Sequence, residues 1–205
     1  MNNPALVADL QQILKGDKFL RVLVDKKHAL PDNYEPEDLV ALNGGSYVAG
    51  RSELLLRREA ALSLEEMAKA AKADGITLVA SSTYRSYIYQ VEVYARNVAQ
   101  MGQKAADRES ARPGHSQHQL GLVVDFGSID DSFAQTAQGK WIAANASRFG
   151  WSLSYPEGFE EITGYRWECW HYRYVGKELA AFIDKYFDGI QQHALEFINS
   201  QEHQQ

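Results

Sequence analysis

The sequence predicts an α+β domain with a central, largely antiparallel sheet and flanking helices. Segments typical of strands and of helices alternate loosely along its 205 residues. Two aromatic-rich segments, Trp151–Tyr155 and Tyr165–Val175, follow one another with only a Pro156-Glu157-Gly158 turn signal between them. Because neighbouring strands joined by a turn pair antiparallel, this order favours an α+β fold over an alternating parallel one.

In the N-terminal half, the apolar pattern predicts four elements. Apolar residues at helical spacing indicate a short helix around Leu6–Leu14, and a strand-like run follows at Leu20–Val24. The composition of Leu54–Ala73, rich in Leu, Ala, Glu, Arg and Lys, predicts a helix that ends before Gly75. Ile76–Ala80 is then expected to be a buried strand.

The C-terminal half predicts three more helices and a strand that ends in a carboxylate. The expected elements are a helix at Tyr87–Met101, a loop at Gln103–Gln117, a buried strand at Leu120–Phe126, a short helix at Trp141–Phe149 and a last helix at Lys177–Ile198. Gly189 is a weak point within the last helix, since glycine has low helix propensity.

The chain contains no internal repeat and no linker long enough to divide it. We therefore expect one domain over residues 20–199, preceded by a helical extension at residues 1–19 and followed by a frayed polar tail at residues 200–205. No heptad pattern or apolar stripe indicates a tight dimer, so a monomer is expected.

Composition excludes several classes of protein. The hydrophobic fraction of 45% and charged fraction of 23% are those of a globular chain. The net charge of −6, with no basic run, argues against nucleic-acid binding. No apolar stretch approaches the length that spans a membrane, and the N-terminus carries no signal-peptide pattern, so we expect a cytoplasmic protein or a mature or trimmed form. One cysteine excludes an internal disulfide and an all-cysteine zinc site.

Two histidines lie in unusual settings. His118 stands at the start of an apolar strand that ends in Asp125, and His171 lies in a second apolar segment, three residues after Glu168. Two imidazoles and one carboxylate are a typical zinc-ligand set that leaves a position open for water, which is the mark of a catalytic site. A further carboxylate, Glu168, is suited to accept a proton from that water.

Simpler interpretations fit the same residues. A histidine beside a tryptophan on a strand is commonly a core residue, and His118 with Asp125 can be a hydrogen-bonded pair that supports a loop. Arg85, taken alone, fits a surface ion pair. Strict strand alternation would also place Glu168 and His171 on opposite faces, so a bulge or turn between them is required if both face one metal.

Three blocks of the sequence resemble the VanY-type D-alanyl-D-alanine carboxypeptidases and the related LD-carboxypeptidases of peptidoglycan turnover. The blocks are Ser82-Thr83-Tyr84-Arg85-Ser86-Tyr87-(x2)-Gln90, Pro113-Gly114-His115-Ser116-Gln117-His118-Gln119-Leu120-Gly121-(x3)-Asp125 and Glu168-Cys169-Trp170-His171-(x1)-Arg173-Tyr174-Val175-Gly176. With a weaker match near Leu23–Val40, the resemblance extends over roughly residues 20 to 180. It implies the hedgehog-like fold of the zinc DD-peptidases and hydrolysis of a terminal D-alanine from peptidoglycan stem peptides.

The resemblance also implies roles for single residues. His118, Asp125 and His171 would bind Zn²⁺, Glu168 would be the general base, and Arg85 would stabilise the oxyanion. The positions implied to contact the substrate are Ser116, Gln90 and Tyr84.

The sequence departs from the family pattern at three positions. Thr83 stands where glycine is usual, Ser154 where the strand often carries arginine, and Cys169 where proline is common. None of these changes removes a predicted zinc ligand or the predicted base.

Two other functions compete with this interpretation. The first is a non-catalytic, zinc-containing peptidoglycan-binding module of the same fold, which would need neither Glu168 nor Arg85. The second is a cysteine hydrolase built on Cys169, but no helix N-terminus is expected there to lower the pKa of the thiol. A peptidoglycan enzyme would work in the periplasm or cell envelope.

Overall fold

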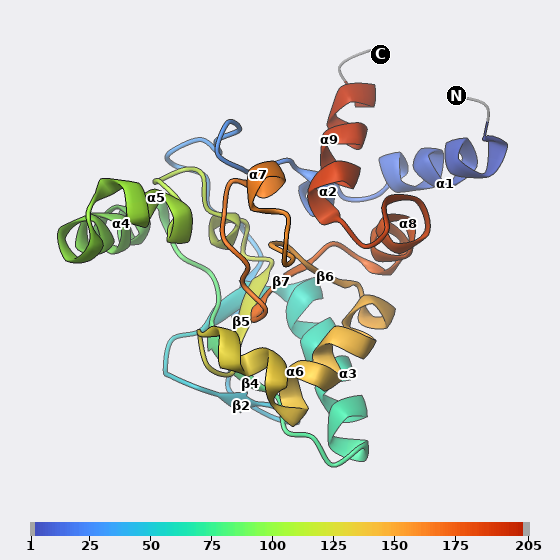
Figure 1. The fold of residues 1–205 in the computed structure, drawn as a ribbon. Helices are drawn as coiled ribbons and strands as arrows, with labels where there is room; N and C mark the ends of the chain where they lie inside the picture. Colours follow the sequence, from blue (N-terminus) through green and yellow to red (C-terminus); the bar gives the residue numbers. More distant parts are fainter. Residues whose placement is uncertain (1–2, 203–205) are drawn as a thin grey trace.

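A computed structural model of the protein describes residues 3–202. The elements, shown in Figure 1, are α1 (Pro4–Lys15), α2 (Lys18–Arg21), β1 (Leu39–Ala41), β2 (Val48–Ala49), β3 (Leu55–Arg57), α3 (Arg58–Ala73), β4 (Val79–Ser82), α4 (Tyr87–Met101), α5 (Gln103–Glu109), η1 (Gln117–Leu120), β5 (Val123–Phe126), η2 (Asp131–Gln135), α6 (Ala137–Asn145), η3 (Ala146–Phe149), β6 (Trp151–Leu153), α7 (Glu160–Thr163), β7 (His171–Tyr174), α8 (Lys177–Phe187) and α9 (Gln191–Glu202). Within residues 3–202, no helix has the length and hydrophobicity needed to cross a bilayer.

The central sheet has five strands in the order β2-β4-β5-β7-β6. Strand β2 pairs with β4 in parallel, and the other pairings in the described chain are antiparallel. Strands β1 and β3 form a separate antiparallel ribbon. The predicted α+β class with a largely antiparallel sheet is confirmed, and β5 lies in the middle of that sheet.

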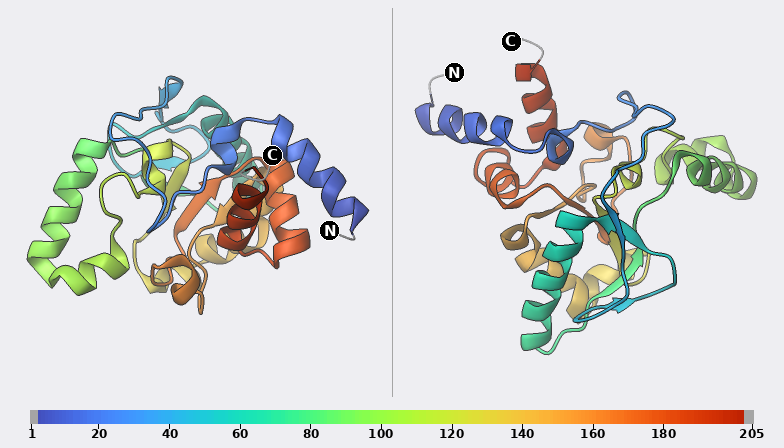
Figure 2. Two further views of the ribbon diagram at one scale, coloured as in Figure 1. Left: turned by 90° about the horizontal axis from the view of Figure 1, so that it is seen from above. Right: turned by 180° about the vertical axis from the view of Figure 1, so that it is seen from behind.

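Two apolar clusters hold the helices in place. The larger one packs α3 and α6 against the sheet and contains the fully buried side chains of Leu64, Phe126 and Trp151. The smaller one joins α1, α8 and α9, with Phe182 and Ile198 at its centre. Helices α4 and α5 project from one side of the molecule, and α1, α8 and α9 gather on the opposite side (Figures 1 and 2). The domain boundaries stay a prediction.

The strand predicted at Leu20–Val24 is wrong. Helix α2 ends at Arg21, and the residues after it are irregular. The buried Arg173 of β7 explains this, because its Nη2 donates to the carbonyl oxygens of Leu20 at 3.1 Å and Val22 at 2.9 Å. Those carbonyls satisfy a buried guanidinium instead of a neighbouring strand.

Three boundaries in the middle of the chain also differ from the prediction. Leu55–Arg57 is strand β3 instead of the first turn of a helix, and α3 begins only at Arg58. The buried strand predicted at Ile76–Ala80 lies further along, as β4. The predicted loop Gln103–Gln117 begins with helix α5, which the left-handed Gly102 (φ 81°) separates from α4.

The C-terminal third contains further differences. The segment predicted as a strand at Tyr165–Val175 is extended and paired only from His171, and α7 lies within the connection from β6. The last helix is two helices, because Asp188 (φ 52°) and Gly189 (φ 77°) break it at the predicted weak point. Helix α9 continues to Glu202, whose carboxylate pairs with Arg21 at 2.9 Å, so the described part of the predicted frayed tail is helical. Residues 203–205 lie outside the described residues.

Candidate metal centre and active site

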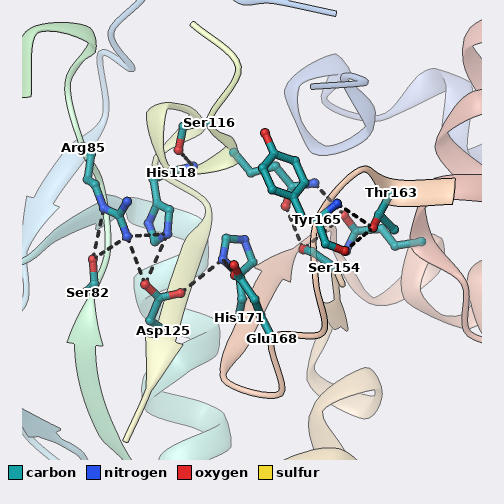
Figure 3. A network of polar contacts seen from close by, with 12 residues as sticks. Ser82, Arg85, Ser116, His118, Asp125, Ser154, Thr163, Tyr165, Glu168 and His171 are labelled. Carbon is teal, nitrogen blue, oxygen red and sulfur yellow. Dashed lines mark hydrogen bonds and ion pairs between the residues drawn. The ribbon is translucent and has the colours of Figure 1, made fainter. Parts of the chain in front are cut away.

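The side chains of His118, Asp125 and His171 meet beside the central strand (Figure 3). One potential ligand atom from each lies within 4.8 Å of the others, and all three residues are buried. Asp125 on β5 and His171 on β7 are directly opposite in the antiparallel register, so their side chains share one face of the sheet. Strand pairing brings Asp125 and His171 together, and His118 comes from the short helix η1.

Local hydrogen bonds orient the His118 ring. Its Nδ1 lies 2.6 Å from the carbonyl oxygen of Thr83, to which it donates, and its Nε2 lies 3.3 Å from Oδ2 of Asp125. The hydroxyl of Ser116 accepts from the His118 amide at 3.3 Å and caps the short helix η1. A proton on Nδ1 leaves the lone pair on Nε2, which therefore points into the site.

Burial and neighbouring charges shift the pKa values of the three side chains in different directions. Burial and the nearby Arg85 cation lower the pKa of His118 to about 4, so this ring is neutral near pH 7. Burial also acts against the imidazolium of His171, but the carboxylates of Asp125 and Glu168 outweigh it and raise the pKa to about 9. Burial alone would raise the pKa of Asp125, yet the adjacent imidazoles hold it well below its ordinary value. The carboxylate is therefore ionised and ready to bind a cation.

The residues of the trio fit a zinc ion. Oδ1 of Asp125 is buried and accepts no well-formed hydrogen bond, although Nδ1 of His171 lies 3.2 Å away, and Nε2 of His171 is buried without a partner among the described residues. Two histidines and one carboxylate are a typical ligand set of catalytic zinc, and the Thr83 carbonyl behind His118 is the kind of contact that orients such a ligand. An orphaned carboxylate oxygen at the centre of the group is the atom that a cation would satisfy.

Glu168 lies beside the trio because a turn precedes β7. The amide of His171 donates to the carbonyl oxygen of Glu168 at 3.2 Å, and β7 begins only at His171. Oε2 of Glu168 consequently reaches to 3.3 Å from Nδ1 of His171. The turn removes the objection from strand alternation, since the two residues do not belong to one regular strand.

Arg85 contacts the predicted ligands directly. Its Nη2 lies 2.9 Å from Nε2 of His118 and 3.1 Å from Oδ2 of Asp125. The same guanidinium donates to the Ser82 hydroxyl at 3.3 Å and to Oε1 of Gln90 at 3.4 Å. A single lone pair on His118 Nε2 serves one partner at a time, so the Arg85 contact and metal coordination at that atom exclude each other.

A cavity of about 170 Å³ opens above these residues. Ser116 lines it, as do the trio, Glu168 and Arg85. Gln90 and Tyr84 are not among its lining residues, and the Gln90 amide is instead held by the carbonyl oxygen of Ala111 at 2.8 Å. In this structure Gln90 therefore positions Arg85 and does not face the cavity.

Sequence reasoning missed several residues that line the cavity. The ring centroid of Tyr155 lies 4.7 Å from that of His171, and Tyr165, Arg166 and Trp170 also line the wall. The remaining lining residues are Glu109, Ser110, Ala111 and Ile129. The aromatic-rich composition of Trp151–Tyr155 and Tyr165–Val175 was the available signal. It indicated strands but did not show which side chains face the cavity.

Cys169 lies outside the cavity. Its thiol contacts the Asp130 carbonyl oxygen at 3.7 Å, and burial raises its pKa. A buried thiol with a raised pKa is a poor nucleophile, which argues against a cysteine hydrolase.

Comparison with known proteins gives matches over most of the chain. The family profile for VanY, D-alanyl-D-alanine carboxypeptidase, matches residues 53–177. YodJ of Bacillus subtilis (strain 168) is 38% identical over 203 residues, which cover 92% of this chain and 74% of YodJ. A D-alanyl-D-alanine carboxypeptidase of Enterococcus faecalis is 34% identical over 82% of this chain, which spans only 62% of that enzyme's length.

Solved structures agree with these matches. The LdcB LD-carboxypeptidase has a TM-score of 0.78 and 38% identity, over 85% of this chain and 84% of LdcB. A zinc complex of a vancomycin-resistance VanY D,D-pentapeptidase has a TM-score of 0.72 and 31% identity, over 86% of this chain and 99% of that one. The fold and the sequence lead to the same conclusion: the chain belongs to the VanY family of D-alanyl-D-alanine carboxypeptidases.

Proposed function

We propose that this protein is a zinc-dependent carboxypeptidase that removes a terminal D-alanine from peptidoglycan stem peptides. The observation that carries the proposal is the buried trio of His118, Asp125 and His171, with the carboxylate of Glu168 beside it in one cavity. A structural zinc site would need four protein ligands and no cavity, whereas a hydrolase needs three ligands and room for a substrate.

In this proposal, each polar side chain of the site has one task. Zinc held by the trio would supply Lewis acidity toward the scissile carbonyl and lower the pKa of water. Glu168, within reach of His171, takes the proton of the attacking water and returns it to the leaving amine. The Arg85 guanidinium swings from His118 toward the developing oxyanion, and the Gln90 and Ser82 contacts keep it close.

The identity of the substrate rests on the relatives. A VanY relative was solved with D-alanine-D-alanine, and LdcB is described as an LD-carboxypeptidase, so both bond types occur among similar proteins. Ser116, on the wall of the cavity, is the residue we assign to substrate contact. We propose that the protein works as a monomer in the cell envelope, where such substrates occur.

The test is hydrolysis of purified muropeptides. The zinc-loaded protein is incubated with a pentapeptide ending in D-Ala-D-Ala and with a tetrapeptide ending in a single D-Ala, and the products are weighed by mass spectrometry. Loss of one alanine from either substrate supports the proposal and identifies the bond. No loss from either, with zinc bound at one ion per chain, would disprove it.

A non-catalytic binding module is the alternative. It would bind both peptides without cleaving them, and replacement of Glu168 would then leave the binding affinity unchanged. The placement of Glu168 against a zinc ligand favours the enzyme, because peptide binding alone does not require a second buried carboxylate there.

A further inference from the structure

A second cavity, of about 490 Å³, adjoins the active site and is lined mainly by basic side chains. Its lining residues are Lys26, Asp107, Arg108, Arg112, His115 and Gly164, and we call it the basic cavity. Three permanent cations and one carboxylate surround it, although the whole chain carries a net charge of −6. A concave surface that is positively charged on a protein of negative net charge favours an anionic ligand.

Lys26 is held firmly at the inner wall of this cavity. Its ammonium lies 3.7 Å from the centroid of the Tyr165 ring and donates to the carbonyl oxygen of Asp107. A Cβ atom at Gly164 (φ 79°) would come within 2.5 Å of Cγ of Lys26, so only glycine leaves room for this side chain. A cation positioned in this way loses little conformational entropy when an anion binds.

The arginines keep donors for a ligand. Arg112 uses Nε and Nη2 to bind Asp107, both at 3.1 Å, and Arg108 uses the same two atoms to bind Glu160. The second edge of each guanidinium, which bears Nη1, lies outside these ion pairs. Two further donors are thereby available at the cavity for a carboxylate.

The basic cavity is one aromatic ring away from the catalytic cavity. Tyr165 lines the catalytic cavity while Lys26 packs on its ring, and the amide of Arg166 donates to the carbonyl oxygen of Arg108 at 3.1 Å, which joins the two walls. Burial lowers the pKa of Lys26, and the negative charge of Glu168 acts in the opposite direction. A peptide bound in the catalytic cavity therefore needs to extend only past the Tyr165 ring to reach the basic cavity.

We infer that the basic cavity binds a free carboxylate of the stem peptide on the N-terminal side of the scissile bond. This inference rests on the proposed function. Stem peptides carry such carboxylates at the γ-linked D-glutamate and, where present, at diaminopimelate, and amidation of either one removes the charge. The protein would therefore discriminate between amidated and free stem peptides at a distance from the bond that it cleaves.

The experiment compares matched substrates. Stem peptides ending in D-alanine are prepared with both carboxylates free, with the D-glutamate amidated, or with the diaminopimelate amidated, and kcat and KM are measured for each. For the wild type, we expect one amidation to lower kcat/KM by about tenfold, chiefly through KM, because the contact is the same in ground and transition states. Which amidation does so identifies the carboxylate.

Variants tie the effect to the cavity. Arg112→Gln and Lys26→Met are expected to lose the preference, whereas Arg148→Gln keeps it, because Arg148 is exposed on η3 and lines neither cavity. The Arg112 side chain is 60% exposed, so its replacement should not disturb folding if Lys26→Met does. Equal rates on free and amidated peptides, or a preference that survives Arg112→Gln, would overturn the inference.

A failure of the proposed function can be distinguished from a failure of this inference. If no substrate is cleaved, calorimetric titration with the same free and amidated peptides still tests the basic cavity. Tenfold weaker binding after amidation, abolished in Arg112→Gln, supports the inference without catalysis, and equal binding refutes it.

Discussion

Replacing Arg85 by alanine should lower the free energy of unfolding of the zinc-free protein and increase its affinity for zinc. In the structure the guanidinium contacts both His118 Nε2 and the Asp125 carboxylate, whose side chain is only 3% exposed. Removing one partner of a buried ion pair costs about 3–5 kcal/mol when the remaining charge is uncompensated. Asp125 retains His171 as a second cationic partner at 3.2 Å, so we expect a smaller loss, of about 2 kcal/mol.

That loss should depend on the metal. When zinc takes the lone pairs of His118 and Asp125, the Arg85 contact is already broken, so the variant no longer suffers the same penalty. The difference of about 2 kcal/mol then corresponds to roughly thirtyfold tighter zinc binding. Turnover should nevertheless fall by about 10²–10³, because the oxyanion loses its donor.

Thermal unfolding followed by circular dichroism, with a chelator and with added zinc, measures both effects. A loss of 2 kcal/mol lowers the Tm of a chain of this size by roughly 4–8 °C. Competition with a chromogenic chelator gives the zinc affinity, and Arg96→Ala, an exposed arginine on α4, is the matched control. A variant with unchanged Tm in chelator and unchanged zinc affinity would refute the reasoning, and an effect on KM alone would assign Arg85 to substrate binding.

Four further results are expected. Protein purified without added zinc should contain, or take up, one ion per chain, and a stoichiometry near zero that zinc cannot restore would contradict the three-ligand site. Glu168→Gln should keep the fold and the zinc but lose activity by about 10²–10⁴, since an amide cannot accept the proton; near-normal turnover would mean another base. Cys169→Ala should retain most activity because the thiol lies outside the cavity, and loss of both zinc and hydrolysis in a folded variant would make Cys169 a ligand. Gln191→Leu should lower the free energy of unfolding in urea by about 2 kcal/mol, because Gln117 at 3.2 Å and the Ser152 carbonyl oxygen at 3.2 Å lose a buried partner, whereas no change would show that water replaces the amide.

The sequence predicted most reliably what is encoded locally. Helix α4 spans Tyr87–Met101, as its apolar spacing predicts, and the carboxylate at the end of an apolar strand marked Asp125. The residue types of His118, Asp125 and His171 suggested a zinc-ligand set, and the resemblance assigned them as ligands. Strand pairing explains why Asp125 and His171 are neighbours. A pattern of single residues does not specify which strands become neighbours.

The missed features depend on partners far away in the chain. Leu20–Val24 has the composition of a strand, but the Arg173 guanidinium on β7 takes its carbonyls. Likewise, the aromatic segment before β7 is not extended throughout, since the turn at Glu168 is stabilised by a hydrogen bond from the Glu168 amide to the Tyr155 carbonyl oxygen at 3.0 Å. In both cases a long-range contact overrides local propensity.

The position of the candidate site follows from the register of the central sheet. Ser82 on β4 and His171 on β7 both lie opposite Asp125, so one row of side chains crosses three strands. The register of β4 shifts between Ala80 and Ser82, which changes the direction of the strand shortly before Arg85. A carboxylate in the middle of a sheet is costly to bury unless cations approach from both sides, and this row provides the imidazole of His171 on one side and, through Ser82, the guanidinium of Arg85 on the other. The geometry that compensates the buried charge of Asp125 therefore also leaves an ionised carboxylate, with one oxygen that accepts no well-formed hydrogen bond, for a metal ion to bind.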